Sequence, residues 1–320
     1  MRILVTGAGG FLGTQVVAEL LERGHEVRAL LRPAAGAAPA DWHGRADVVR
    51  ADLRSIGEPM VLFAGVEVVV HLAAAMRGTA EAQFAGTVIG TERLLEAMQR
   101  ASGPRRLVLA SSCSVYDWSA ARARLDEAGP IEARPFERDG YAIAKIWQER
   151  VARRIAQRNG WTLTVLRPGF IHGSGGPVVA GAGLMLGRAF IVIGPFNTLA
   201  LTEVRNCARA FADAAEKGVA GTYNIVDDER ISAWRYAGEL LQGGGASFRI
   251  PVPYLGGIGL AHVAQAISRL LYRAHGGKLP GVLIPRRYRA RFRPLRFDNA
   301  RAKAELGWSG TPLRETAGSP

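Results

Sequence analysis

Short apolar runs without polar alternation recur through the first half of the chain, and stretches with helical spacing separate them. The run at residues 3–5 is typical of a strand buried on both faces of a parallel sheet. Apolar positions then recur at helical spacing over residues 11–21, and Gly24 marks the expected end of that helix. The same patterns predict strands at residues 25–31, 48–51, 66–72, 106–110 and 163–166, and helices at residues 87–100 and 141–159.

This alternation predicts an α/β fold, a Rossmann-type doubly wound parallel sheet. We expect residues 1–170 to form a dinucleotide-binding domain, completed by a returning strand near residues 222–226. After residue 169 the chain becomes richer in glycine, and helices are predicted at residues 203–217, 232–241 and 263–272. Residues 171–320 are therefore expected to form mainly a smaller substrate-binding region.

A glycine-rich turn joins the first predicted strand to the first predicted helix. Gly7 permits the tight turn, Gly10 lets the backbone approach a pyrophosphate, and Gly13 lets the helix lie close to the strand. The helix N-terminus would then direct free N–H groups at an anion. The alternative is a plain strand–helix turn, but strand, glycines and helix in register favour a dinucleotide site.

The end of the second predicted strand bears on the choice of cofactor. NAD-binding units place an acidic residue about 20 residues beyond the glycines, where this chain has Leu31 and Arg32. An arginine there suits a 2′-phosphate, so NADP(H) is favoured, and NAD(H) is the alternative. Arg32 could also be an ordinary solvated surface residue.

Tyr141 and Lys145 lie four residues apart and therefore on one face of the predicted helix. An ammonium group beside a phenol lowers the phenol pKa, which would let Tyr141 exchange a proton with a carbonyl or alcohol oxygen. Ser112 belongs to a serine pair at the end of another strand, where open α/β sheets bind their ligands. The three residues together predict an active site.

On these motifs the chain resembles the extended short-chain dehydrogenase/reductase family over nearly its whole length. The matching segments are the TGxxGxxG loop (residues 6–13), Asp52 and Leu53, HxAA (71–74), SSxxVY (111–116), Tyr141 with Lys145, the LRPxxxxG strand end (166–169), and the terminal FD…ELGW segment (297–308). The resemblance implies that Ser112, Tyr141 and Lys145 are catalytic, with Ser112 holding the substrate oxygen and Lys145 also binding the nicotinamide ribose. It further implies cofactor contacts at Gly7, Gly10, Phe11, Leu12, Gly13, Arg32, Asp52, Leu53, Leu72, Ala73, Ala74, Tyr141, Lys145 and Pro168.

Departures from the family pattern narrow the expected reaction. Thr87 stands where the family usually has asparagine, and Cys113 stands where sugar-nucleotide dehydratases carry an acidic residue, so dehydratase chemistry is disfavoured. The run RPGFIHG resembles the reductase and hydroxysteroid-dehydrogenase branches. We expect an NAD(P)-dependent oxidoreductase acting on a carbonyl or secondary alcohol. The alternative is an NAD-dependent sugar-nucleotide epimerase that uses the same site, and a non-catalytic cofactor sensor is disfavoured by the intact triad.

Two residues near the predicted site have open roles. Cys113 is interpreted as a small buried filler, with a role as active-site acid or base as the alternative. His172 either lines the substrate pocket or caps a loop. No metal site is expected, because the two cysteines, Cys113 and Cys207, define neither a zinc site nor a disulfide framework.

The net charge of +13 and isoelectric point near 10.6 are unusual for an enzyme of small molecules. Only four of the 41 basic residues are lysines, so an arginine-rich composition explains the charge better than nucleic-acid binding does. Residues 285–297 are interpreted as a solvated edge strand. The alternative is that an arginine among Arg286, Arg287, Arg289, Arg291, Arg293 and Arg296 reaches an anionic group in the pocket.

The remaining expectations concern surroundings and partners. No signal peptide or transmembrane segment is expected, and the cysteine usage fits a reducing compartment, so a cytoplasmic location is predicted. The helix within residues 261–272 is interpreted as a packing helix over the substrate cleft, with peripheral membrane contact as the alternative. The expected partners are a small-molecule substrate and, from the family resemblance, a second copy in a homodimer.

Overall fold

The computed structural model describes residues 1–101, 103–244, 246–272 and 279–311. Its centre is a seven-stranded sheet of order β12-β7-β5-β4-β1-β2-β3 in which every neighbouring pair is parallel. The strands are β1 (Arg2–Thr6), β2 (Glu26–Leu31), β3 (Ala46–Arg50), β4 (Val68–His71), β5 (Arg106–Ala110), β7 (Thr162–Pro168) and β12 (Gly221–Ile225). The predicted α/β doubly wound fold is confirmed, and the strand expected near residues 222–226 joins the sheet beside β7.

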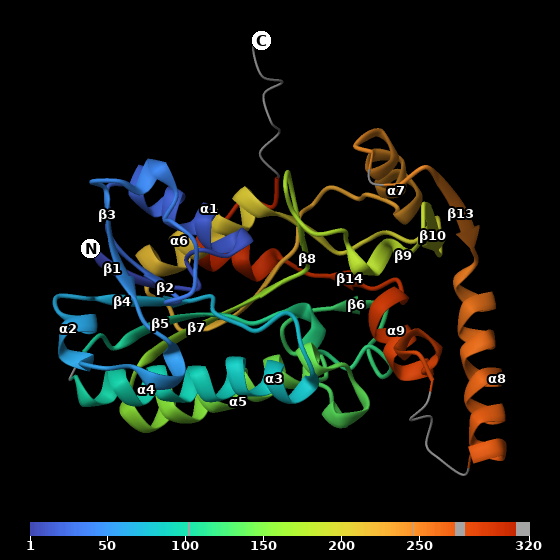
Figure 1. The fold of residues 1–320 in the computed structure, drawn as a ribbon, viewed down its shortest axis with the longest axis horizontal. Coiled ribbons are helices and arrows are strands. Elements are labelled where there is room, and N and C mark those ends of the chain that lie inside the picture. Colours follow the sequence, from blue (N-terminus) through green and yellow to red (C-terminus); the bar gives the residue numbers. More distant parts are fainter. Residues whose placement is uncertain (102, 245, 273–278, 312–320) are drawn as a thin grey trace.

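Helices cover both faces of this sheet (Figure 1). One face carries α1 (Phe11–Glu22) and α6 (Val204–Lys217), and the other carries α2 (Pro59–Phe63), α3 (Ala80–Phe84), α4 (Gly90–Arg100) and α5 (Gly140–Asn159). Because successive side chains of a strand point to opposite faces, Ile3 and Val5 pack in the core beneath α1 and α6. Leu4 packs instead with Leu94 of α4. Because both faces of these strands are buried, their sequences are continuous apolar runs without polar alternation.

Most predicted helices lie where the pattern placed them, with shifts at their ends. The helix predicted at residues 87–100 is a π-helical turn, η3 (Ala85–Ile89), that continues into α4. The helix predicted at residues 263–272 begins nine residues earlier, as α8 (Tyr254–Tyr272). The helix predicted at residues 232–241 is α7 (Ala233–Gln242).

Outside the main sheet, the described residues form three small sheets. A three-stranded sheet has the order β13-β10-β9, and the pairs β11-β8 and β14-β6 form the other two. The strands are β6 (Arg124–Leu125), β8 (Phe170–His172), β9 (Gly183–Leu186), β10 (Ala189–Ile193), β11 (Leu201–Glu203), β13 (Phe248–Val252) and β14 (Arg296–Phe297). Single turns at η1 (Ala40–Trp42), η2 (Leu53–Ser55), η4 (Cys113–Val115), η5 (Pro135–Glu137), η6 (Ala180–Ala182), η7 (Gly281–Leu283) and η8 (Ala302–Leu306) complete the elements.

The arginine-rich stretch corrects one prediction. Residues 285–297 are not an edge strand: most of the stretch is a helix, α9 (Pro285–Phe292), and only Arg296 and Phe297 form strand β14. Pro285 occupies the first helical turn, where its missing N–H costs nothing. Tyr288 and Phe292, four residues apart, pack with Ile193, so burial of this helical face outweighs the alternating pattern.

Within the described residues, no helix is long and apolar enough to cross a membrane. The same part of the chain holds no group of three His, Cys, Asp or Glu residues placed to bind a metal ion. The division of the chain near residue 170 into a dinucleotide-binding and a substrate-binding part stays a prediction.

Candidate active site

The residues predicted to bind the cofactor follow successive strands at one edge of the sheet. The turn of residues 7–13 follows β1, Arg32 follows β2, Asp52 and Leu53 follow β3, Leu72, Ala73 and Ala74 follow β4, Ser112 follows β5, and Pro168 ends β7. All these strands are parallel, so their carboxyl ends share this edge, where open α/β sheets bind ligands. The fold therefore brings these segments to a common side of the molecule.

The glycine turn is packed against the segment after β4. Gly7 has a φ of +71°, a left-handed conformation that favours glycine, and a Cβ there would lie 2.8 Å from the Ala73 nitrogen. A Cβ on Gly13 would overlap the Gly7 carbonyl oxygen. Because both obstacles are backbone atoms, they cannot rotate away, and neither glycine can be replaced without moving the turn.

The N-terminus of α1 fits an anionic group. Gly10 is the N-cap and supplies no side-chain hydrogen bond, and the first turn of α1 holds no acidic residue. The free N–H groups of a helix start attract negative charge. This turn, with its closely approaching backbone, is therefore suited to the pyrophosphate of a dinucleotide.

The segments that follow β2 and β3 are polar, and some of their polar groups already have hydrogen-bond or ion-pair partners within the chain. Arg32 is exposed, and its carbonyl oxygen accepts a 3.3 Å hydrogen bond from Nη1 of Arg50. The Asp52 carboxylate forms a 2.6 Å ion pair with Arg54, which lowers the pKa of Asp52 to about 2. Asp52 also caps η2 through the Arg54 N–H. The cofactor roles of Arg32, Asp52 and Leu53 stay predictions.

Thr87 has a structural role at the position where the family pattern has asparagine. Its hydroxyl accepts a 2.9 Å hydrogen bond from the backbone N–H of Ala75. This bond ties the segment that follows β4 to η3, and it fixes the loop holding Ala73 and Ala74.

Tyr141 and Lys145 lie together on the first turns of α5, and Ser112 lies close to Tyr141. Nζ of Lys145 lies 5.9 Å from the centre of the Tyr141 ring. Burial raises the pKa of Tyr141 to about 12, and interaction with the Ser112 hydroxyl partly opposes that rise. Tyr141 therefore carries its proton at neutral pH and can act as a proton donor.

This result differs from the expected acidic phenol. Nζ of Lys145 donates to the Ala110 carbonyl oxygen at 2.6 Å and to Oε1 of Gln148 at 2.9 Å. Burial lowers the pKa of Lys145 to about 7, and the charge of Glu149 opposes this change. Because the ammonium is directed at these two oxygens, burial dominates the ionisation of Tyr141.

A buried polar chain leads from Lys145 to the end of β1. Nε2 of Gln148 donates a 2.9 Å hydrogen bond to the Thr91 hydroxyl oxygen. The same oxygen lies 2.7 Å from Nε2 of His71. Nδ1 of His71 lies 2.6 Å from the Thr6 hydroxyl. Thr91 gives its own proton to the Thr87 carbonyl oxygen, so His71 donates from Nε2 and accepts at Nδ1. Burial and the charge of Lys145 keep His71 neutral, with a pKa of about 3.

The sequence motifs did not identify Gln148 as a residue of the site. Its position could have indicated a role, because Gln148 follows Lys145 by three residues and residues at that spacing lie on the same face of a helix.

Ser111 and Arg167 anchor the segment that carries Ser112. The Ser111 hydroxyl donates to Glu149 at 2.7 Å, and Arg167 forms a buried ion pair with the same carboxylate at 2.5 Å. These contacts hold the end of β5 against α5 and the end of β7. Sγ of the buried Cys113 donates to the Arg167 carbonyl oxygen, and burial raises the pKa of that thiol far above its ordinary value. Cys113 is buried, as its interpretation as a small filler expects, and its role stays a prediction.

A small pocket adjoins this segment. Its lining combines polar and apolar side chains, which are Trp118, Phe170, Asn197, Thr198, Leu199, Ala200, Arg291, Phe292, Arg293 and Leu295. Trp118 Nε1 donates to the Cys113 carbonyl oxygen, next to Ser112. Trp118 thus connects the pocket with the segment that carries Ser112, but Ser112, Tyr141 and Lys145 do not line the pocket. His172 lies half-buried in β8 and is not among the residues lining this pocket; its role stays open.

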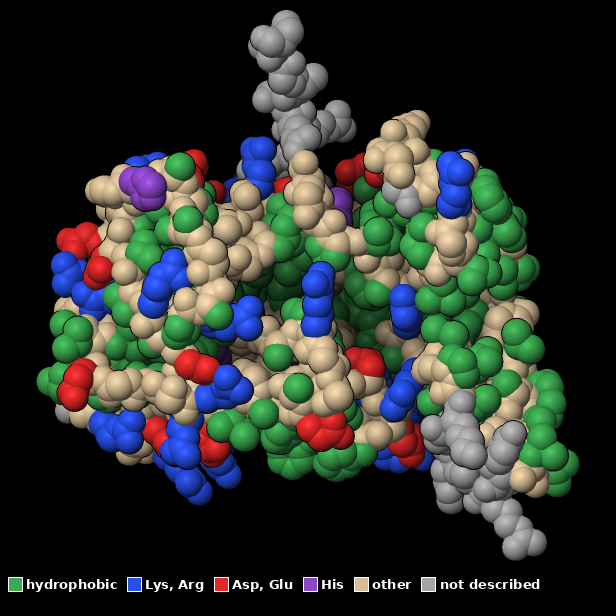
Figure 2. Space-filling view, viewed as in Figure 1, with side chains coloured by type: hydrophobic (Ala, Val, Ile, Leu, Met, Phe, Trp, Pro, Cys, Tyr) green, Lys and Arg blue, Asp and Glu red, His purple; other side chains and the backbone are tan. Residues whose placement is uncertain are grey.

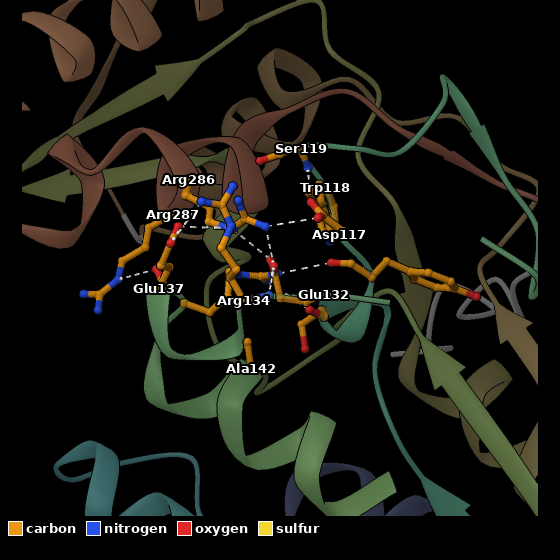
Figure 3. A network of polar contacts seen from close by, with 12 residues as sticks. Asp117, Trp118, Ser119, Glu132, Arg134, Glu137, Ala142, Arg286 and Arg287 are labelled. Atoms are coloured by element: carbon orange, nitrogen blue, oxygen red, sulfur yellow. Dashed lines mark hydrogen bonds and ion pairs between the residues drawn. The ribbon is translucent and has the colours of Figure 1, made fainter. Parts of the chain in front are cut away.

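One arginine of the arginine-rich stretch meets buried carboxylates (Figure 3). Arg286 of α9 forms ion pairs with Glu132 and, at 3.0 Å, with Asp117. Glu132 also pairs with the buried Arg138 at 3.3 Å. We call Asp117, Glu132, Arg138 and Arg286 the Arg286 cluster. It joins α9 to the segment between Ser112 and Tyr141, so the expected solvated face is wrong for Arg286.

Comparison with known proteins shows the family of this chain. The model of the NAD dependent epimerase/dehydratase family matches residues 3–225. A 3beta-hydroxysteroid-dehydrogenase/decarboxylase of Arabidopsis thaliana is 30% identical over 98% of this chain and 77% of its own length. A 3 beta-hydroxysteroid dehydrogenase/Delta 5-->4-isomerase of Mycobacterium tuberculosis is 30% identical over 96% of this chain and 85% of its own. The solved structure of the dTDP-glucose 4,6-dehydratase DesIV from Streptomyces venezuelae, with NAD bound, has a TM-score of 0.73, with 23% identity over 99% of this chain and 94% of its own.

Proposed function

The chain belongs to the NAD-dependent epimerase/dehydratase family, and from this premise we propose that it is an NAD(P)-dependent oxidoreductase of the extended short-chain type, interconverting a carbonyl and a secondary alcohol. The observation that carries the proposal is the grouping of Ser112, Tyr141 and Lys145 beside the glycine turn at the carboxyl edge of the sheet. A sensor that only binds a nucleotide has no need of such a proton-donating group.

The glycine turn at residues 7–13 would hold the cofactor pyrophosphate, and the segment at residues 72–74 would lie against the cofactor because Gly7 and Ala73 are in close contact. Arg32, exposed after β2, would pair with a 2′-phosphate, so we propose a preference for NADP(H) over NAD(H). When bound, the nicotinamide supplies or accepts a hydride.

In the reducing direction, Tyr141 gives its phenolic proton to the substrate carbonyl oxygen, and the Ser112 hydroxyl donates a hydrogen bond to the same oxygen. The high pKa of Tyr141 keeps this proton in place at neutral pH until the oxygen gains negative charge. The Lys145 ammonium then stabilises the phenolate that remains. Ala110 and Gln148 hold Nζ of Lys145 in position for this task.

The proposed substrate class rests on the similar proteins and not on the small pocket, because the walls of that pocket combine apolar side chains with Asn197, Thr198, Arg291 and Arg293. Two of the similar proteins reported above are hydroxysteroid dehydrogenases. We therefore propose an apolar ketone or secondary alcohol as the substrate class.

Tyr141→Phe tests the proposal. We expect turnover of NADPH with apolar ketones to fall by about 10²- to 10⁴-fold, because the proton donor is lost, while the affinity for NADPH changes little. Tyr254→Phe, at a tyrosine outside the site, is the matched control. Full activity of Tyr141→Phe would overturn the proposed role of this residue.

The fate of the cofactor separates the two candidate reactions. A reductase consumes NADPH when a ketone is added. A sugar-nucleotide epimerase oxidises and re-reduces the same carbon, so it shows no net consumption. Mass measurement of any nucleotide retained on purification, followed by a turnover assay with both cofactors, distinguishes them. Failure to bind either NAD(H) or NADP(H) would contradict both.

We also propose a cytoplasmic location and a homodimer. The location is supported by Cys113 and Cys207, which are free thiols buried apart from each other in the fold. The dimer rests on the family resemblance alone, and light scattering tests it.

A further inference from the structure

Helix α8 turns an apolar face to the solvent. Its exposed positions include Leu255, Leu260, Val263, Ile267, Leu270 and Leu271. Leu255 and Leu270 are 78% and 82% exposed. The first five side chains recur every three to five residues and Leu271 adjoins the last of them, so the six form one broad stripe along the helix. Soluble helices ordinarily turn such a stripe inward, which makes this outward stripe unusual.

The opposite face of α8 is packed against the rest of the chain. Ala261 and Ser268 are buried on that side. Ile258 and Tyr254 pack on Tyr288 and Phe292 of α9, and a Cβ at Gly257 would overlap the Tyr288 hydroxyl. Gly257 therefore permits close contact between the two helices. The orientation of α8 is fixed by this packing, and the apolar stripe is left without a partner among the residues that the structure describes.

The apolar stripe continues onto neighbouring strands. Phe248 and Ile250 of β13 are exposed, as are Met185 and Leu186 of β9 in the same small sheet. Figure 1 places α8 and β13 at one end of the molecule, and Figure 2 shows hydrophobic side chains along that end. We call the exposed apolar residues of α8 and β13 the α8 face. Contiguous apolar surface of this kind marks a site of association.

The segment of the sequence that includes β13, α8 and α9 carries positive charge and no negative charge. Residues 240–297 contain ten Lys or Arg and no Asp or Glu. This segment therefore supplies a large part of the net charge of +13 that the whole chain carries. Among the described residues, Arg249 and Arg291 form no ion pair and donate instead to the carbonyl oxygens of Trp234 and Ala180. Arg289 contacts His262 of α8. Arg286 is the exception, because it pairs with Asp117 and Glu132.

We infer that the α8 face docks on a lipid bilayer that contains anionic headgroups. Apolar side chains would enter the boundary between headgroups and acyl chains, and the surrounding arginines would attract anionic lipid. A second copy of the chain is the less favourable occupant, since two surfaces of the same sign would repel each other. Among the described helices none can cross a membrane, so α8 lies on the bilayer surface.

The test uses the full-length protein and sedimentation with two kinds of vesicle. One is pure phosphatidylcholine, and the other contains phosphatidylglycerol at about one third of the lipid. We expect binding to the anionic vesicles, weaker binding to the neutral ones, and loss of binding at high salt, where surface charges are screened.

A charge-matched pair of variants locates the binding surface. Val263→Glu with Ile267→Glu alters two exposed residues of α8, and we expect at least about tenfold weaker vesicle binding. Met60→Glu with Val61→Glu alters two exposed residues of α2, at the opposite end of the molecule, with the same charge change. We expect that control to bind like the unaltered protein within about twofold. Circular dichroism and thermal unfolding check that both variants are folded.

Three results would overturn the inference. The first is no sedimentation of the unaltered protein with anionic vesicles at low salt. The second is an equal loss of binding in both double variants, which would indicate attraction by net charge alone. The third is a dimer of the unaltered protein that the α8 variant dissociates, because a second copy would then cover the α8 face.

Discussion

Nζ of Lys145 donates a hydrogen bond of 2.9 Å to Oε1 of Gln148, three residues further along α5. The amide of Gln148 is itself fixed by the Thr91 hydroxyl. Gln148 is therefore a positioning residue, which acts on the reaction only through the location and ionisation of the Lys145 ammonium.

Gln148→Leu removes the acceptor for that ammonium. The charged form of Lys145 then loses a partner, so its pKa falls further below about 7. We expect turnover to decline by about tenfold and its loss with rising pH to begin at a lower pH. Gln148→Glu places a negative charge beside Nζ and should shift the same limb to higher pH. The check is a pH profile of turnover, and shifts of the same sign in both variants would contradict the role.

His71 is expected to make the protein sensitive to acid. Its pKa is about 3 in the folded chain, compared with an ordinary value of 6.5. Between these values the unfolded chain binds a proton that the folded chain does not, so the free energy of unfolding falls as pH falls from 6.5 towards 3. From pH 6.5 to pH 4 this one residue accounts for on the order of 3 kcal/mol.

His71→Asn removes that titration. The variant should be less stable than the unaltered protein at pH 7, by about 1–3 kcal/mol, because the contacts to Thr6 and Thr91 are weakened. Its stability should fall less steeply between pH 6.5 and pH 4. Urea unfolding at several pH values measures both effects, and an equal slope in the two proteins would show that His71 titrates normally.

Arg286→Met leaves the buried Glu132 and Asp117 carboxylates short of a positive partner. Glu132 is 1% exposed, and an unpaired buried charge is strongly destabilising, so we expect a loss of about 3 kcal/mol in the free energy of unfolding. Arg287→Met is the matched control, since among the described residues the Arg287 guanidinium forms no ion pair and donates one long hydrogen bond, to the Glu137 carbonyl oxygen at 3.4 Å. That control should lose less than about 0.5 kcal/mol. Adding Glu132→Gln to Arg286→Met should recover part of the stability.

Gly13→Ala should disrupt the dinucleotide turn. The added methyl group would overlap the carbonyl oxygens of Gly7 and Ala8, which are backbone atoms that cannot rotate aside. We expect NADPH affinity to fall by at least about tenfold. Gly9→Ala, in the same turn, meets only the flexible end of the Leu31 side chain at 3.0 Å and should bind nearly normally. Fluorescence titration measures both, and equal affinities would disprove the packing argument.

Arg32→Ala tests the choice of cofactor. Loss of the guanidinium should weaken NADPH binding by about tenfold and leave NADH binding nearly unchanged. Arg100→Ala, at the exposed end of α4 away from the carboxyl edge, is the control. If NADPH keeps its advantage in Arg32→Ala, the 2′-phosphate is bound elsewhere.

The sequence predicted the parts of the fold that local pattern controls. The buried strand at Ile3–Val5, the glycines after it and the helix from Phe11 are neighbours in the chain, and they formed as expected. The pairing of Tyr141 with Lys145 was also local, since one helical turn separates them.

What the sequence missed depends on distant contacts or on orientation. Tyr288 and Phe292 fit a strand pattern and a helix pattern equally well, and only packing against Ile193 decided between them. Arg286 meets Glu132 across 154 positions of chain, which no spacing rule could identify. The spacing of apolar residues predicted a helix within α8, but that spacing could not show that the apolar stripe faces the solvent.

The C-terminal segment completes the core of the nucleotide-binding half. Leu306 and Trp308 pack in the core beneath α1 and α6, and Trp308 Nε1 donates to the Asn206 carbonyl oxygen at 3.0 Å. Strand β12 likewise covers the edge of β7. A fragment ending near residue 170 would lack Leu306, Trp308 and strand β12. It would therefore expose the edge of β7 and much of this core to water. Both halves should therefore melt in a single cooperative transition, and neither should persist as an autonomous module after proteolytic cleavage.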